Sequence, residues 1–148
     1  MVFMTERKAR YKLMSEPKRV VWNGTCKDEL SKFPADVKAK MGHHLYLSQI
    51  KQPSSFTKPF TGGHGISESN NKLFQISVRD DTAYRLVFAN LPDAIYPLHV
   101  FTKSSEATAS QEVERISQRY KEAQKLSEQV RLRRPERKRE KYDARFRG

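Results

Sequence analysis

Arg85 is the residue whose type and setting most suggest chemistry, because it stands in the apolar run from Tyr84 to Phe88. A lone arginine is costly to bury, so its side chain must reach an exposed surface or pair with a carboxylate. A guanidinium is planar and can bind two oxygens of one phosphate. Two interpretations are open here: a phosphate-binding group, or an arginine that is solvated or paired with Asp80 or Asp81.

His99 is a second candidate, and it alternates with Phe101 in another apolar run. The pKa of a free histidine lies near neutral pH, so His99 could donate or accept a proton. A histidine in such a run is more often a core residue with satisfied hydrogen bonds. Tyr96 and Tyr120 could similarly act as acids or stack on bases, although core packing is the more frequent role of such rings.

The other histidines lack the spacing of a metal site. His43 and His44 are adjacent on an expected helix, so they point to different faces, and no cysteine or carboxylate completes a ligand set. The glycine-rich residues 62–65 lack the flanking strand and helix, and the Lys-Ser/Thr pair, of a phosphate-binding loop. We therefore expect neither a metal nor another cofactor.

The charge of the chain is concentrated at its two ends. The 148 residues include 29 Lys and Arg against 17 Asp and Glu, a net charge of +12. Residues 1–20 contribute +4 and residues 121–148 contribute +6, which leaves +2 for residues 21–120. Such a basic balance points to an anionic partner, either nucleic acid or an acidic protein surface. The ends then either face RNA or are solvated tails.

Several features favour a cytoplasmic protein. The sequence contains one cysteine, Cys26, which excludes an intramolecular disulfide and fits a reducing compartment. No apolar run approaches the roughly 20 residues of a membrane span. The N-terminus, with Arg7, Lys8 and Arg10, lacks the apolar stretch of a secretory signal.

The apolar periodicity predicts four strands and three helices. We expect strands at residues 18–23, 73–79, 83–90 and 94–102. We expect helices at residues 25–32, at 34–51 and from 108 past 126. The second helix has an apolar stripe of Val37, Met41 and Leu45, and the last three strands are joined by short polar turns that favour an antiparallel meander. Pro97 removes an amide donor from its strand, so it implies an edge strand or a bulge.

This element order predicts an α+β domain with its helices on one face of an antiparallel sheet. Residues 52–70 read as a loop, and Thr25 and Thr108 as the starts of capping boxes. We divide the chain into an N-terminal basic extension (1–17), a folded domain (18–127) and a basic C-terminal tail (128–148). The tail contains Pro135 and lacks an apolar stripe, so we expect it to be helical in part or disordered without a partner.

This order and several local strings resemble the RelE/ParE toxin superfamily, specifically its phage-derived HigB-like branch. The strings are Trp22 after the first strand, Phe33-Pro34 between the helices, Lys58-Pro59-Phe60 before the glycine loop, Tyr84–Phe88 and Ile95–Lys103. Together they span roughly residues 18–125, and their order and spacing make them more specific than any one string alone.

The resemblance implies the toxin of a type II toxin–antitoxin pair, a translation-dependent mRNA endonuclease that uses no metal. Such cleavage directs a ribose 2′-hydroxyl at its neighbouring phosphate, with a proton acceptor, a cation and an acid to assist. Lys103 would be a phosphate clamp or, with a lowered pKa, the proton acceptor. The candidate residues are Arg85, Lys103 and His99 for catalysis, and Lys58, Arg79 and Arg119 for RNA binding. The implied partners are mRNA on the ribosome and a cognate antitoxin, commonly a helix-turn-helix protein.

Some positions depart from the family pattern. Gln75 and Ser77 stand where Glu and Arg are usual, Pro97 replaces an ordinary strand residue, and Ser104 stands where a second Lys is common. Charges that could contact phosphate are therefore missing. One alternative is a non-catalytic member of the same fold that binds RNA or protein. Another is a ParE-like inhibitor of DNA gyrase, which the basic candidate residues favour less.

Overall fold

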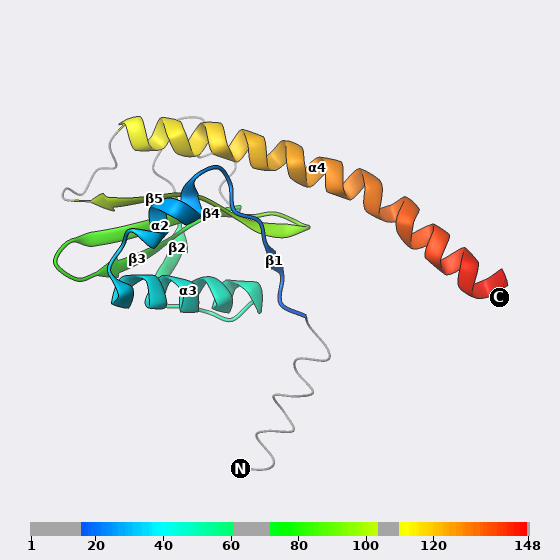
Figure 1. Cartoon of the computed structure of the whole chain (residues 1–148), viewed down its shortest axis with the longest axis horizontal. Coiled ribbons are helices and arrows are strands. Elements are labelled where there is room, and N and C mark those ends of the chain that lie inside the picture. The colour runs from blue at the N-terminus through cyan, green and yellow to red at the C-terminus, as the bar shows by residue number, and fades with distance from the viewer. Residues whose placement is uncertain (1–15, 61–71, 104–109, 148) are drawn as a thin grey trace, which may run out of the picture.

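The described part of the chain forms a five-stranded sheet with three helices (Figure 1). The computed structural model describes residues 16–60, 72–103 and 110–147, of which Lys103 and residues 134–147 are described by their backbone alone. In chain order the elements are β1 (Arg19–Val20), α2 (Cys26–Ser31), α3 (Ala35–Gln49), β2 (Thr57–Pro59), β3 (Leu73–Arg79), β4 (Ala83–Asn90), β5 (Ala94–Lys103) and α4 (Ser110–Arg147). This content confirms the predicted α+β class.

The sheet has the strand order β1-β5-β4-β3-β2. Strands β3, β4 and β5 follow one another in the chain and pair antiparallel, which confirms the meander. At one edge β1 pairs parallel with β5, so the sheet is mostly but not wholly antiparallel. At the other edge β2 pairs with β3, although the sequence predicted a loop there. That prediction was wrong because β2 has only three residues and ends at Pro59, too short a segment for alternation to be visible.

The helices lie on both faces of the sheet, which corrects the expectation that only one face is covered (Figure 1). On one face α2 and α3 pack over a core that includes Leu86 and Phe88 of β4. On the opposite face α4 packs over Val87 and Ala89 of the same strand. Successive strand residues point to opposite faces, so an unbroken apolar run needs cover on both sides. The run from Leu86 to Ala89 therefore explains the three layers.

The apolar stripes predicted on the helices form the core. Val37, Met41 and Leu45 of α3 are buried on one side of the sheet. On the other side the buried residues of α4 are Ile116, Tyr120 and Ala123, which recur at helical spacing. Both stripes were predicted from the sequence and are confirmed.

The capping box predicted at Thr25 does not form. Thr25 directly precedes α2, but its side chain makes no cap hydrogen bond, and its hydroxyl donates to Glu29 Oε1 at 2.8 Å. A capping residue needs an extended backbone, whereas Thr25 has φ −95° and ψ 12°. The second predicted capping residue, Thr108, lies outside the described residues.

Pro97 lies at a bulge and not in an edge strand, because β5 has neighbours on both sides. The β4–β5 register pairs Val87 with His99 and Phe88 with Pro97, which leaves Leu98 without an opposite residue. A bulge of this kind leaves the extra residue out of the ladder and bends the strand. The bulge that Pro97 predicted is therefore confirmed, and it frees the backbone of Leu98 for other contacts.

Helix α4 is 38 residues long and continues past Pro135 to Arg147. Figure 1 shows its second half extending beyond the sheet. The boundary that we place at residue 128 falls inside this helix. Among the described residues, no helix combines the length and apolar character needed to cross a membrane.

Candidate nucleic-acid interface

Arg85 lies near the beginning of β4, opposite Ser77 of β3 and Phe101 of β5. Its side chain is half-buried, and Nη1 donates to Gln75 Oε1 at 3.2 Å. Its Nε is buried without a hydrogen-bond partner among the described residues. Within that part of the chain no carboxylate lies at ion-pair distance from Arg85. Arg85 is therefore a cation whose donors are only partly used.

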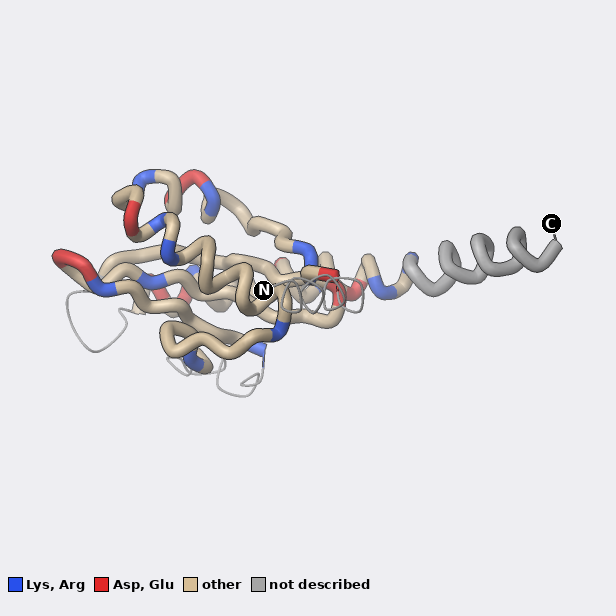
Figure 2. Tube along the Cα trace, turned by 90° about the horizontal axis from the view of Figure 1, so that it is seen from below, with Lys and Arg blue, Asp and Glu red and all other residues tan. Residues whose placement is uncertain are grey.

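The acids of the β3–β4 hairpin do not pair with Arg85. Asp81 Oδ1 instead accepts hydrogen bonds from the hydroxyl of Tyr84 at 2.8 Å and from the amide of Thr82 at 2.9 Å. Figure 2 shows this acidic hairpin tip at the far end of the sheet from the described end of α4. The ion pair with Asp80 or Asp81 that the sequence left open is therefore absent from the described residues.

Lys58 lies on the same side of the sheet as the Arg85–Gln75 contact. It stands opposite Gln75 in the β2–β3 register, and Gln75 stands opposite Val87 in β4. Directly opposite residues share a face, and Val87 packs in the core under α4. Lys58 is exposed, so its ammonium is accessible on the α4 side of the sheet.

Arg79 and Lys103 belong to the last row of the sheet. The register places Arg79 opposite Ala83, and Ala83 opposite Lys103. Ala83 and Arg85 are two residues apart in one strand, so they share a face. In Figure 1 the β3–β4 hairpin at this end lies beyond the start of α4. We call these four positions the basic face: Lys58, Arg79, Arg85 and Lys103.

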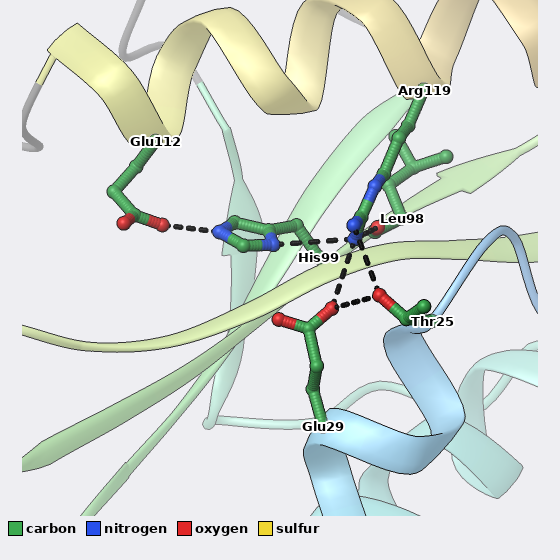
Figure 3. Close-up of polar contacts among 6 residues, drawn as sticks. All are labelled: Thr25, Glu29, Leu98, His99, Glu112 and Arg119. Atoms are coloured by element: carbon green, nitrogen blue, oxygen red, sulfur yellow. Dashed lines mark hydrogen bonds and ion pairs between the residues drawn. The ribbon is translucent and has the colours of Figure 1, made fainter.

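The other two candidates, His99 and Arg119, lie in a separate cluster between α2, β5 and α4 (Figure 3). Nη1 of Arg119 donates to the carbonyl oxygen of Leu98 at 2.7 Å and to Glu29 Oε1 at 3.3 Å. Nη2 donates to the hydroxyl of Thr25 at 3.3 Å. The Arg119 side chain is only 15% exposed, so most of its donors are used inside the protein.

His99 is 2% exposed and is engaged at both ring nitrogens. Nε2 contacts a carboxylate oxygen of Glu112, and Nδ1 lies 3.4 Å from Nη1 of Arg119 (Figure 3). Glu112 is in the first turn of α4, where a carboxylate interacts favourably with the helix dipole. These contacts favour a structural role in which His99 fastens the start of α4 to β5. The catalytic role of His99 stays a prediction.

Two titratable groups near the cluster have shifted pKa values. Burial raises the pKa of Glu29, but the Thr25 hydrogen bond and the Arg119 charge outweigh it, and the net pKa is lowered. Glu29 is therefore a carboxylate at neutral pH and pairs with Arg119. Burial raises the pKa of Cys26 to about 12, so its thiol stays protonated and is not a nucleophile near neutral pH. The described residues contain no group of three His, Cys, Asp or Glu placed to hold a metal ion.

The sequence predictions missed most of the contacts of the cluster. Glu112 and Arg119 are seven residues apart, so they lie on one face of α4, and this spacing was a usable signal. Thr25 and Glu29 are likewise one turn apart. The carbonyl of Leu98 gave no signal, because only the three-dimensional position of the bulge brings it to Arg119.

Comparison with known proteins identifies the family. Residues 28–121 match the model of the family described as phage derived protein Gp49-like (DUF891). The chain belongs to this family. The match covers more than half of the chain and confirms the phage-derived branch that the sequence strings resemble. It includes the basic face and, apart from Thr25, the His99–Arg119 cluster, and it ends before the second half of α4.

No curated protein matches the Gp49-like chain. Among solved structures, it is similar to a chain in the crystal structure of the toxin–antitoxin complex RelBE2 from Mycobacterium tuberculosis. The two chains share 21% sequence identity with a TM-score of 0.39, over 60% of this chain and 94% of the other.

Proposed function

We propose that this Gp49-like chain is the toxin of a type II toxin–antitoxin pair and cleaves mRNA on the ribosome without a metal. The main observation is the setting of Arg85, a half-buried cation with an unused donor and no carboxylate partner among the described residues. Membership of the phage-derived family supports the proposal through the resemblance of its strings to RelE/ParE toxins.

The proposed reaction is an attack of a ribose 2′-oxygen on the adjacent phosphorus. The new P–O bond forms as the bond to the 5′-oxygen of the next nucleotide breaks, which leaves a cyclic phosphate and a 5′-hydroxyl. A base takes the proton of the 2′-hydroxyl, and an acid protonates the leaving oxygen. The guanidinium of Arg85 would stabilise the negative charge that develops on the phosphate oxygens, because its fork can bind two of them.

The remaining cations of the basic face would hold the RNA backbone. Lys58 and Arg79 are exposed on either side of the Arg85 row, and phosphate contacts of this kind fix the register of a nucleic acid. Lys103 stands in the last row of the sheet, and we assign it to the phosphate or to proton transfer. Arg119 has few donors left for RNA, so we assign it a supporting role through His99.

A specific observation also favours a second function, that of a non-catalytic binding protein of the same fold. Ser77 and Phe101 stand opposite Arg85 in register, and Gln75 is its hydrogen-bond partner. None of these side chains accepts or donates a proton readily near neutral pH. His99 is buried and engaged with Glu112 and Arg119. Arg85 could then hold a phosphate without cleaving it.

The partners that we propose follow from the resemblance. The substrate is mRNA on the ribosome, and the inhibitor is a cognate antitoxin, in this branch a helix-turn-helix protein encoded beside the toxin. Both partners place the protein in the cytoplasm.

Expression without an antitoxin tests the proposed function. We expect growth to stop and translated messages to be shortened, while messages without a start codon remain intact. A matched Lys38→Gln variant, changed at an exposed residue of α3, should behave like the wild type. Normal growth and intact messages with folded protein present would contradict the toxin and favour the binding protein. A fall in DNA supercoiling with intact messages would instead indicate gyrase inhibition.

A further inference from the structure

A cavity of about 390 Å³ lies between the end of α3 and the strands β2, β3 and β4. This volume falls within the roughly 300–1,000 Å³ of small-molecule sites in proteins. The cavity lies on the face of the sheet that α3 covers, because Phe74 and Phe88 line it and pack in the core under that helix. It opens to solvent at three exposed lining residues, Lys51, Pro53 and Pro59.

Hydrogen-bond donors gather at this cavity. The ammonium of Lys51 makes no hydrogen bond or ion pair within the described part of the chain. Asn90 also lines the cavity, and its Oδ1 accepts a hydrogen bond from the ammonium of Lys18 at 2.6 Å. Because an ammonium can only donate, this contact fixes the orientation of the Asn90 amide. Its NH₂ group then has no partner among the described residues, so both Lys51 and Asn90 have donors to offer a ligand.

Lys18 and Lys51 lie near each other because the chain before β1 is tied to the end of α3. The amide of Lys18 donates to the carbonyl oxygen of Gln49 at 3.0 Å, and Gln49 Nε2 donates to the carbonyl oxygen of Lys18 at 2.7 Å. Burial and the charge of Lys51 lower the pKa of Lys18, and the charge of Asp93 opposes them only in part. The two ammonium groups are therefore close enough to repel each other.

No carboxylate lines the cavity to balance these two charges. Asp93, whose charge acts on Lys18, is 7% exposed and is engaged elsewhere. Its carboxylate accepts hydrogen bonds from the hydroxyl of Tyr96 at 2.6 Å and from the hydroxyl of Ser127, and the guanidinium of Arg19 lies 3.9 Å away. Two cations beside a cavity whose lining lacks an acid attract an anion to it.

The backbone of Lys51 gives independent evidence that its side chain has a use. Its φ is 59°, in the left-handed region that favours glycine. The amide of Gln52 donates to the carbonyl oxygen of Leu47 at 2.8 Å, and the amide of Lys51 to that of Ser48 at 3.2 Å. These are the two hydrogen bonds of a Schellman motif, in which glycine usually takes the position that Lys51 has here. A lysine therefore stands where a glycine would be less strained.

The chemistry of the lining defines the ligand. Two ammonium groups match a phosphate monoester, which carries nearly two negative charges at neutral pH, whereas a carboxylate carries one. Lysine binds phosphate as a point charge. The apolar lining residues Pro53, Pro59, Phe74 and Phe88 offer a surface for a planar group attached to the phosphate.

We propose that this cavity binds a small phosphate monoester that carries a planar apolar group, the chemistry of a nucleoside monophosphate. Lys51, Lys18 and Asn90 hold the phosphate, and Phe74 and Phe88 contact the planar group. The basic face lies on the other side of the sheet, under α4, so this site does not depend on the proposed cleavage of RNA (Figure 1).

Calorimetric titration of the full chain with phenyl phosphate and with adenosine 5′-monophosphate tests the site. Each ester should bind at one site, and inorganic phosphate should bind at least tenfold more weakly, because it lacks the planar group. Lys51→Gln should weaken binding of the esters about tenfold, as for one lost hydrogen bond from a charged group. The matched Lys38→Gln variant, changed at an exposed residue ten positions before Ser48 in the same helix, should bind like the wild type.

A glycine at position 51 separates a role in binding from a role at the end of the helix. Lys51→Gly should unfold at the same temperature as the wild type or a higher one, because glycine adopts this φ without strain. Binding of phenyl phosphate should fall as it does in Lys51→Gln. A lower melting temperature with binding retained would make Lys51 a residue that stabilises the helix end through its charge, and would overturn the proposal.

Arg85→Ala separates this site from the basic face. It should bind both esters like the wild type even if the proposed cleavage fails, and loss of binding in this variant would assign the esters to the basic face instead. Absence of binding to the wild type, or equal losses in Lys51→Gln and Lys38→Gln, would also overturn the proposal. Benzoate bound as tightly as phenyl phosphate would contradict the assignment to a phosphate.

Discussion

Arg85 and Arg119 show how two residues of one type acquire different roles from their contacts. Arg119 donates to a carbonyl, a hydroxyl and a carboxylate, and its side chain is 15% exposed. Arg85 donates to one amide oxygen, and its Nε has no partner among the described residues. The first arrangement stabilises the packing of α4, and the second leaves a cation that can bind a phosphate.

Changing His99 to Gln separates a structural role from a catalytic one. Loss of the contacts with Glu112 and Arg119 should lower the free energy of unfolding by about 1–3 kcal/mol. Cleavage per folded molecule and its pH profile should stay unchanged. Urea unfolding and a cleavage assay measure the two effects, and His43→Gln, at an exposed position of α3, is the control. A hundredfold loss of cleavage with full stability would make His99 the acid or the base.

At the scale of elements, two polar contacts determine where α4 lies. Near its start, Glu112 and Arg119 reach His99 of β5. Farther along, Ser127 reaches Asp93 in the β4–β5 turn. The apolar residues of α4 between these two points bury surface against the sheet. The polar contacts determine the direction in which the helix runs over it. Each polar contact therefore affects the position of α4 as well as the stability of the fold.

The contact between Ser127 and Asp93 should depend on pH, because Asp93 takes part in it as a carboxylate. Burial raises the pKa of Asp93, but the hydrogen bonds from Ser127 and Tyr96 outweigh it, and the net pKa lies below the usual 3.8. The stabilisation is therefore present above about pH 4 and is lost as the pH falls through the lowered pKa. Asp93→Asn should cost about 1–3 kcal/mol at pH 7, and its difference from the wild type should shrink below pH 3.8.

Thermal or urea unfolding between pH 2 and 7 measures this difference. Asp28→Asn, at an exposed position of α2, is the matched control and should not show the same loss in acid. A difference that stays constant down to pH 2 would contradict the assignment of the stabilisation to the ionised Asp93.

The sequence predicts the elements whose signal is local. The meander follows from alternation and short turns, and the bulge follows from Pro97, which lacks an amide donor. The edge strand that includes Lys58 is too short to show a period. The contact between Arg85 and Gln75 depends on strand register, which alternation alone does not fix in detail. The candidate residues could therefore be selected by their type. The structure was needed to divide them into the basic face and the His99–Arg119 cluster.

At the scale of the whole molecule, the net charge is concentrated at the two ends of the sequence, whereas residues 21–120 carry only +2. The basic face lies toward the β3–β4 hairpin, and α4 extends from the opposite end of the sheet (Figure 1). On the proposed function, the ribosome is an RNA-rich surface that could engage the basic face and the basic C-terminal tail (128–148) at once. Two linked contacts bind more tightly than either alone when their spacing matches the target. On this account the basic C-terminal tail supplies affinity and the basic face supplies chemistry.

Substitution of Arg85 by Ala tests the central claim most directly, with RNA cleavage and unfolding measured on the same protein. We expect nearly unchanged stability and a loss of cleavage of about a hundredfold or more, the scale for one donor to a developing charge. Arg85→Lys should restore it only in part, because an ammonium lacks the guanidinium fork. Lys38→Ala should cleave like the wild type. Persistent cleavage in the folded Arg85→Ala variant would place the catalytic cation elsewhere, and unfolding of that variant would make Arg85 a structural residue.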